Sequence, residues 1–342
     1  MKVEFRTVIE IPHPPFFITP SSRLMFLGSC FSNAIGKRFI ENRLNAVSNP
    51  FGTLYNPYSI WQLLRMIGKG NHDFSPYLFK KEELWFSWLH STAFYNKSRQ
   101  LLLEQLRHDM EKTDEYFRQT DVLFITWGTN RYYTLANQEQ CIVSNCHKCP
   151  SDTFQEHQAT VEDITSMGKE VISEIIQYHP QIRFVITISP YRYRKYGFHG
   201  NQLAKATLLL AADHLAKIFP DNIWYFPAYE IVLDELRDYR FYADDNLHIS
   251  NQAEEYIWER VKDILLDKDT LHMMQRWDSI RKRIQHQPMN PQSESYRSFL
   301  QTLVKDISLF GKDYPHEDIE CYLNDLKKKN KLLFIIHYNH EI

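Results

Sequence analysis

The chain has 342 residues, of which 43% are hydrophobic, and its 40 basic and 42 acidic side chains give a net charge of −2. A chain of this length buries a large core and exceeds one typical domain without requiring two. The near balance of charge provides no field that attracts nucleic acid or an anionic membrane, so we expect neither as a partner.

Apolar segments and segments with helical periodicity alternate along most of the chain. Short runs rich in β-branched and aromatic residues predict buried strands at residues 23–28, 121–126, 182–189 and 223–226. Helical periodicity predicts helices at residues 32–44, 57–67, 100–118, 160–178, 202–217 and 252–267. This alternation is typical of an α/β fold, here a three-layer α/β/α sandwich in which helices cover both faces of a central parallel sheet.

The pattern changes beyond about residue 271, where the sequence becomes charged and helical until an apolar run at residues 332–338. Basic runs at residues 281–283 and 327–331 are interpreted as solvated helix faces, because nucleic-acid binding needs a wider basic surface. We therefore predict a main domain at residues 1–268 and a mainly helical C-terminal extension at residues 269–342.

The N-terminus and the cysteines favour a cytoplasmic protein. Residues 1–6 carry charges where a secretory signal is apolar, and no run reaches membrane-spanning length. The five cysteines form an odd set in a chain large enough to fold without disulfides, which suits a reducing compartment.

A candidate nucleophile follows the first predicted strand. The segment Gly28-Ser29-Cys30 lies at a strand-to-helix turn, where the unpaired N–H groups that open the helix stabilise an oxyanion. Ligands bind at the carboxyl ends of parallel strands, which is the edge where this turn falls. Cys30 is the first candidate, with a small buried structural thiol as the alternative interpretation. Ser29 is the second candidate nucleophile.

A candidate base and its orienting carboxylate lie near residue 248. Asp245 precedes His248 by three residues, a spacing that allows both to share one face of a helical turn, with Asp245 orienting His248 as general base. Asp244 is the alternative orienting carboxylate, and helix capping is the alternative role for the pair.

A cluster of possible metal ligands occurs at Cys141, Cys146, His147 and Cys149. Structural zinc takes four ligands, often as two spaced pairs, and no second pair lies nearby, so we predict no metal and no cofactor.

The same segment is better interpreted as a loop over the active site. In this interpretation Asn145, His147 and Lys148 contact the substrate. His90 is either another residue of the pocket or a hydrogen-bonded core histidine.

These motifs resemble the GSCFA family, which is grouped with the SGNH (GDSL-like) hydrolases. Residues 28–32 match its N-terminal motif, with Ser32 in place of the final Ala. Further matching segments are Asn49 to Pro57, Asn145 to Lys148, Gly200 to Lys205, and Tyr242 to His248. The resemblance runs over about residues 20–260.

The resemblance implies a three-layer hydrolase fold with Cys30 at the nucleophile position, Ser29 in place of the usual Asp, and the Asp245–His248 pair. It also implies an oxyanion hole formed by the N–H groups of Cys30 and Gly52 and the side chain of Asn130. A thiol nucleophile shifts the expectation towards acyl transfer or thioester chemistry. We expect the helix start and the imidazolium to lower the pKa of Cys30.

Two functional hypotheses follow. The first is a hydrolase of ester or thioester bonds, an acyl esterase or acyltransferase with a covalent acyl intermediate on Cys30, His248 as base and Asp245 as orienter. Its expected substrate is a small-molecule or carbohydrate acyl ester, and the 14% aromatic content suits a pocket for such groups. The alternative is a non-catalytic binding or assembly protein that retains the hydrolase fold.

Overall fold

The computed structural model describes residues 5–67, 72–315, 319–326 and 328. These residues belong to two compact units. The first consists of the described residues within 1–16, 23–38 and 46–265, and the second of those within 17–22, 39–45 and 266–342. The apolar run predicted at residues 332–338 lies outside the described residues.

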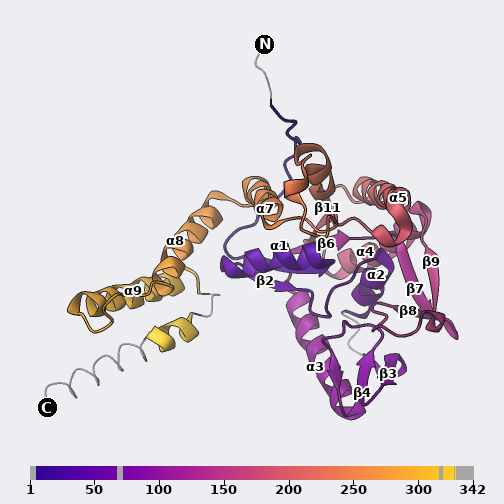
Figure 1. The fold of residues 1–342 in the computed structure, drawn as a ribbon, viewed down its shortest axis with the longest axis horizontal. Helices are drawn as coiled ribbons and strands as arrows, with labels where there is room; N and C mark the ends of the chain where they lie inside the picture. Colours follow the sequence, from indigo (N-terminus) through magenta and orange to yellow (C-terminus); the bar gives the residue numbers. More distant parts are fainter. Residues whose placement is uncertain (1–4, 68–71, 316–318, 327, 329–342) are drawn as a thin grey trace. The chain divides into compact units, whose positions relative to one another are not determined.

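The first unit is an α/β fold around a five-stranded sheet in the order β11-β10-β6-β1-β2 (Figure 1). Its strands are β1 (Arg23–Gly28), β2 (Asn45–Ser48), β6 (Val122–Trp127), β10 (Arg183–Ile188) and β11 (Ile223–Phe226). The pairings β1–β6, β6–β10 and β10–β11 are parallel. All four predicted strands are confirmed, because continuous apolar runs are what a parallel sheet buried on both faces requires.

Six helices of the first unit correspond to the predicted ones. They are α1 (Cys30–Glu41), α2 (Pro57–Met66), α3 (Arg99–Phe117), α4 (Val161–Tyr178), α5 (Gly197–Ile218) and α7 (Asn251–Leu265). Helix α5 begins five residues before its predicted start, and the short α6 (Ala228–Glu230) was not predicted. Local signals set two of the starts: Asn56 accepts the N–H of Ser59 before α2, and Thr160 and Asp163 form a capping box at α4. Helix α1 starts two residues earlier than predicted, so Cys30 is its first residue.

Two small antiparallel sheets were not predicted from the sequence. One contains β3 (Leu78–Lys81), β4 (Leu84–Ser87) and β5 (Tyr95–Asn96), and the other has the order β8-β7-β9 with β7 (Arg131–Leu135), β8 (Gln138–Val143) and β9 (Phe154–Gln158). Figure 1 shows them as extensions beyond the strands of the central sheet. Their strands are short and partly exposed, so each depends on its partner strand more than on an apolar pattern of its own.

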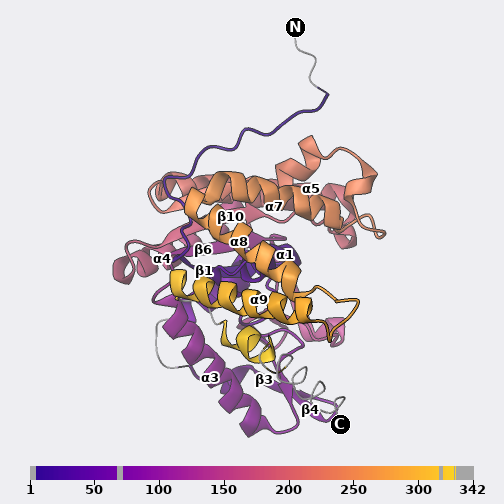
Figure 2. The same ribbon diagram turned by 90° about the vertical axis from the view of Figure 1, so that its left-hand side faces the viewer.

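The second unit is helical, with α8 (Lys268–Ile284) packed against α9 (Glu294–Asp313) (Figure 2). Trp277 on α8 is buried against the ring of Phe310, at a centroid distance of 5.3 Å. The guanidinium of Arg43 lies 4.6 Å from the ring centroids of both Trp277 and Tyr322. A C-terminal helical region is therefore confirmed.

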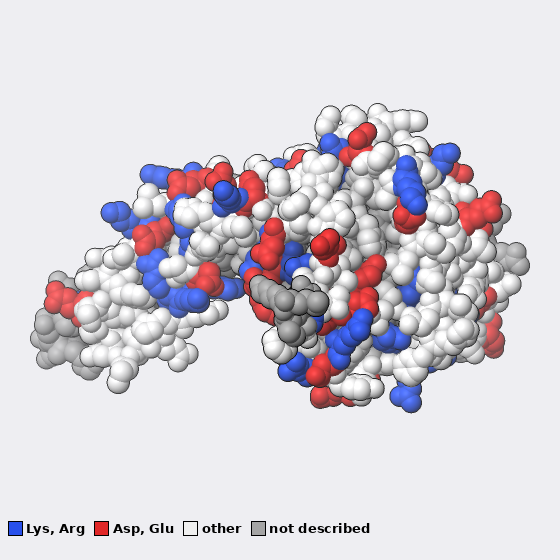
Figure 3. Space-filling view, turned by 90° about the horizontal axis from the view of Figure 1, so that it is seen from above, with Lys and Arg blue, Asp and Glu red and all other residues white. Residues whose placement is uncertain are grey.

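The surface carries charges of both signs. Lysine, arginine, aspartate and glutamate are interspersed on the face shown in Figure 3. Among the described helices, none combines the length and apolar character that a membrane span requires.

Candidate active site

A glycine brings the end of β1 close to β6. Gly28 has a φ of +146°, and a Cβ at this position would lie 2.3 Å from the carbonyl oxygen of Thr126. The N–H of Gly28 donates to Oδ1 of Asn49 at 2.8 Å, and its carbonyl accepts the N–H of Leu54 at 2.8 Å. Only glycine allows this approach, and it places Cys30 in the first turn of α1 at the carboxyl edge of the sheet.

Cys30 is partly exposed, and its pKa is raised above the ordinary thiol value. Burial is the largest cause; hydrogen bonds from the N–H groups of Phe31 and Cys30 lower the pKa, and the carboxylate of Glu254 raises it. The expectation of a lowered pKa was wrong, because desolvation of the thiolate outweighs the N–H groups of the helix start. At neutral pH the thiol form of Cys30 is therefore favoured over the thiolate.

The second candidate nucleophile is less accessible. Ser29 is 1% exposed, and its hydroxyl lacks a hydrogen-bond partner within the described part of the chain. Its carbonyl accepts the N–H of Asn33 in the first turn of α1. Ser29 is thus buried next to Cys30.

Asp245 and His248 meet in a loop and share no helical turn, so that detail of the prediction was wrong. Oδ1 of Asp245 accepts the N–H of Leu247 at 2.8 Å and that of His248 at 2.9 Å, while Oδ2 lies 2.6 Å from Nδ1 of His248. A β-bridge between Tyr242 and Ile249 closes the loop. These hydrogen bonds, with the bond to the imidazole as the largest cause, lower the pKa of Asp245 to about 2.

The alternative carboxylate, Asp244, is exposed, and it is the carboxylate of Asp245 that accepts the hydrogen bond from the imidazole. With Nδ1 of His248 bonded to a carboxylate, Nε2 is the ring nitrogen left to accept a proton.

Cys30 and His248 line the same cavity, although they are far apart in the sequence. The cavity measures about 70 Å³ and is lined by Cys30, Phe31, Ser189, Pro190, Tyr191, His248, Ile249 and Glu254. The ring of Tyr191 packs on that of His248 with centroids 4.4 Å apart. Within the described residues no direct hydrogen bond joins the sulfur to the imidazole, and the cavity has room for a bridging water between them.

A larger cavity of about 770 Å³ lies elsewhere in the first unit, lined by residues 5–8, 234–238, 240 and 241. None of the candidate nucleophiles, bases or orienting carboxylates is among its lining residues. The chemistry predicted from the sequence therefore points to the smaller cavity.

Gly52 does not line the cavity of Cys30. Its N–H donates to the carbonyl of Asn49 at 2.8 Å, within a tight turn. Its φ is +83°, and a Cβ there would lie 2.2 Å from Oγ of Ser91, so the glycine is explained by the turn and by close packing. The N–H predicted for the oxyanion hole is thus engaged inside the loop.

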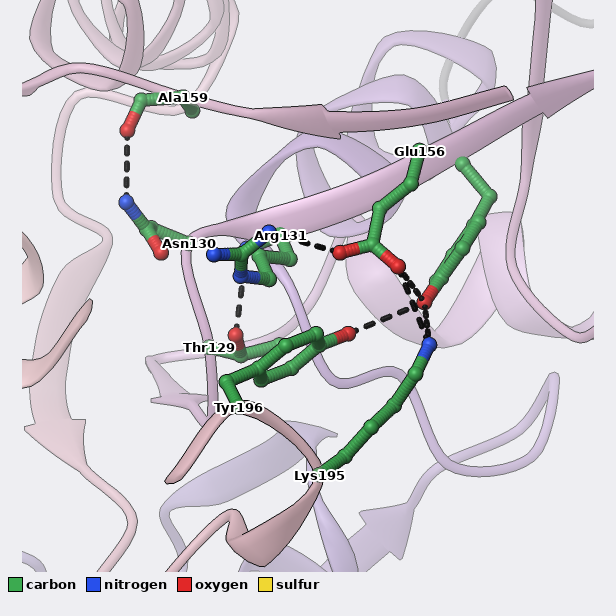
Figure 4. A network of polar contacts seen from close by, with 8 residues as sticks. Thr129, Asn130, Arg131, Glu156, Ala159, Lys195 and Tyr196 are labelled. Carbon is green, nitrogen blue, oxygen red and sulfur yellow. Dashed lines mark hydrogen bonds and ion pairs between the residues drawn. The ribbon is translucent and has the colours of Figure 1, made fainter. Parts of the chain in front are cut away.

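Asn130 is also held away from the cavity. The side chain is 1% exposed, and its Nδ2 donates to the carbonyl of Ala159 at 2.8 Å (Figure 4). The N–H of Ala159 donates back to the carbonyl of Asn130. Of the three predicted oxyanion donors, the N–H of Cys30 is the one at the cavity.

A network of ion pairs lies beside Asn130. Glu156 on β9 binds Arg131 on β7 at 2.7 Å and Lys195 at 3.0 Å, and it also accepts the hydroxyl of Tyr133 at 2.6 Å (Figure 4). These contacts hold β7, β9 and the segment around Lys195 together.

The predicted substrate-contacting residues gather around β4 and are not among the residues that line the cavity. His90 and His147 are buried and both contact Ser87: Nδ1 of His90 lies 2.8 Å from the Oγ of Ser87, and Nε2 of His147 lies 2.9 Å from its carbonyl oxygen. Burial lowers the pKa of His90 to about 3. Asn145 accepts the N–H of His147 at 2.8 Å, whereas Lys148 is exposed.

The cysteines of the possible metal cluster pack as apolar side chains. Cys141, Cys146 and Cys149 are free thiols in a small cluster with Trp88 and Leu135. Burial raises the pKa of Cys141 and of Cys146 to about 11. In the described ranges no three histidine, cysteine or acidic side chains are placed to hold a metal ion.

The structure places a buried lysine, to which sequence analysis assigned no role, against a residue that lines the cavity. Lys205 on α5 is 1% exposed, and its Nζ donates to the carbonyls of Gly128 and Ser189, both at 2.7 Å. These carbonyls follow β6 and β10. A lysine on the same helix face as Leu208 and Ala212 was the available signal.

The fold and the site define an α/β protein with a cysteine and a His–Asp pair at the carboxyl edge of a parallel sheet. The GSCFA family model matches residues 23–261, and the model described as "GSCFA domain protein, C-terminal domain" matches residues 277–331. The chain belongs to the GSCFA family. No curated protein shows a significant match to it.

Proposed function

We propose that the protein is an ester or thioester hydrolase, or an acyltransferase, that works through an acyl intermediate on Cys30. The observation that carries the proposal is the shared cavity of Cys30 and His248, with Asp245 bonded to the far ring nitrogen. A nucleophile, a base and an orienting carboxylate in this order are the components of acyl transfer.

The raised pKa of Cys30 requires a base in the first step. Nε2 of His248 removes the thiol proton as the sulfur attacks the carbonyl carbon of the substrate, and the new C–S bond places a negative charge on the carbonyl oxygen. The imidazolium then gives its proton to the departing alcohol or thiol. Asp245, ionised above about pH 2, stabilises the imidazolium throughout.

The second half of the reaction reverses these roles. His248 removes a proton from water or from another acceptor, which attacks the thioester carbon, and the Cys30 thiol is restored by the imidazolium proton. The N–H of Cys30, at the start of α1, is positioned to donate to the oxyanion in both halves. Gly52 and Asn130 are engaged elsewhere, so this oxyanion site relies on fewer donors than the family resemblance implied.

The proposal includes a three-layer α/β/α sandwich of the SGNH hydrolase type, supported by the parallel order of the central sheet and by a nucleophile directly after its β1. It also includes a small acyl group as substrate, since the cavity is only about 70 Å³. A small-molecule or carbohydrate ester of a short acid fits this size.

The test is covalent labelling of the whole chain by p-nitrophenyl acetate, followed by intact mass and peptide mapping. We expect an acetyl adduct on Cys30 that is absent from Cys30→Ala and forms at least tenfold more slowly in His248→Ala. Cys321→Ala removes an exposed cysteine and serves as the matched control, with unchanged labelling.

An acetyl adduct that maps to Ser29 would identify Ser29, and not Cys30, as the nucleophile. Labelling of Cys30→Ala and His248→Ala at the wild-type rate and extent would contradict the enzymatic proposal and favour a binding or assembly protein.

A further inference from the structure

Lys205 carries a buried amine that the proposed mechanism does not use. Its ammonium nitrogen lies 2.7 Å from each of two main-chain carbonyl oxygens, and the ring centroids of Tyr193 and Tyr229 are 5.4 and 5.6 Å away. A neutral amine has two N–H groups, which these two carbonyls satisfy. The protonated ammonium has a third N–H group, for which the described contacts provide no hydrogen-bond acceptor.

One of the two carbonyls belongs to a residue that lines the candidate site, and the other follows the neighbouring strand β6. Gly128 follows β6, two residues before Asn130, and Ser189 follows β10 and lines the cavity of Cys30. A Cβ at Gly128 would lie 2.4 Å from the hydroxyl of Tyr193, so this corner is closely packed. Lys205 therefore joins the ends of two neighbouring strands at the edge where Cys30 lies.

The charge of Lys205 interacts with Cys30. The pKa of Lys205 is lowered to about 7, mainly by burial and in smaller part by the charge of Arg192, while a negative Cys30 opposes this lowering. Reciprocally, Lys205 lowers the pKa of Cys30. Such reciprocity is a thermodynamic necessity for two coupled charges.

We propose that Lys205 is a positioning residue of the Cys30 site, which holds the turns after β6 and β10 and supplies positive charge that stabilises negative charge at Cys30. The proposal rests on the proposed function only in treating Cys30 as the reactive group.

Other charged and titratable groups also face this pair. Arg192 faces Lys205, and the phenol of Tyr229 lies against its ammonium. Glu254, on α7, opposes thiolate formation at Cys30, as do the phenols of Tyr191 and Tyr193 when ionised. Lys205 opposes part of the effect of Glu254 on the thiol, in addition to the N–H groups of Phe31 and Cys30.

The test is the pH profile of Cys30 alkylation by iodoacetamide in the full chain, from pH 6 to 10, measured by peptide mapping after short pulses. We compare the wild type with Lys205→Met, Lys205→Gln and Lys205→Arg. The control is Lys217→Met, which removes an exposed lysine from the same helix α5.

At pH 6.5, where Lys205 is protonated, both neutral variants should alkylate Cys30 about three- to tenfold more slowly than the wild type. At pH 9.5 the wild-type amine has lost its proton, so the rates should converge. Lys205→Arg, which keeps the charge, should show no such slowing at pH 6.5. A purely structural role would change the rate by a similar factor at every pH.

A folded neutral variant with the wild-type rate at pH 6.5 would overturn the proposal, and so would a folded Lys205→Arg that is as slow as the neutral variants. Lys205→Gln retains a donor for one carbonyl and gives a second neutral variant if Lys205→Met does not fold. Because alkylation needs no turnover, failure of the acetyl labelling and failure of this charge effect are separate results.

Discussion

Gly28→Ala tests the geometry that places Cys30. The substitution forces a side chain onto a backbone with a φ of +146° and puts its Cβ 2.3 Å from the carbonyl oxygen of Thr126. A strained backbone of this kind costs about 1–3 kcal/mol, and overpacking adds about 1–3 kcal/mol. We expect the free energy of unfolding of the first unit to fall by about 4 kcal/mol.

Gly197→Ala is the matched control for Gly28→Ala. Gly197 also has a positive φ, +69°, but a Cβ there would meet no atom within 4 Å. Gly197→Ala strains the backbone but causes no steric clash, so we expect its free energy of unfolding to fall by about 2 kcal/mol.

Thermal unfolding followed by circular dichroism measures both variants. At roughly 2–4 °C per kcal/mol for a unit of this size, Gly28→Ala should lower the Tm by about 8–16 °C and Gly197→Ala by about 4–8 °C. Equal melting temperatures for the two variants, or a Gly28→Ala variant that melts with the wild type, would refute the close packing of β1 on β6.

Three further predictions concern other parts of the first unit. The pKa of His90 is about 3 in the folded protein and 6.5 in the unfolded chain. The contribution of this group to the free energy of unfolding is therefore fully present above pH 6.5 and is lost as the pH falls towards 3. Urea unfolding at pH 5 and pH 7 should show a loss of about 2 kcal/mol in the wild type that His90→Phe largely removes; an equal loss in both would exclude His90 as the cause. Asp245→Asn keeps an acceptor for the loop N–H groups but loses the carboxylate, so acetylation of Cys30 should slow at least tenfold, and an unchanged rate would show that the carboxylate does not orient His248. Glu156→Gln weakens a partly exposed ion-pair network and should cost about 1 kcal/mol or less in urea unfolding, without changing the alkylation rate of Cys30; a change in that rate would tie the network to the site.

The central sheet was predictable from the sequence because strands buried on both faces need continuous apolar runs. The segments that became β1, β6, β10 and β11 have this pattern, and their boundaries agree with the structure within about two residues. The strands of the two small sheets are partly exposed and carry mixed patterns. These strands form because each pairs with a partner strand, and the sequence of one strand alone does not reveal that pairing.

The contact between Asp245 and His248 was also predictable, since three residues of chain keep the two side chains within reach. The shape of the loop was not predictable, because it follows from a carboxylate that accepts two backbone N–H groups and from a bridge across the loop. The oxyanion roles of Asn130 and Gly52 could not be judged from the sequence. Their residue types fit an oxyanion hole, but in the fold the side-chain amide of Asn130 donates to the carbonyl of Ala159 and the N–H of Gly52 donates to the carbonyl of Asn49.

The sequence by itself determined the alternation of strands and helices, the turn that carries Cys30 and the pairing of Asp245 with His248. Each of these depends on residues close together in the chain. Only the tertiary structure decided that Cys30 and His248 share a cavity, that burial raises the pKa of the Cys30 thiol, and that the amine of Lys205 joins the ends of β6 and β10. Burial and Coulomb interactions depend on distances between segments that are remote in sequence, and folding is what sets those distances.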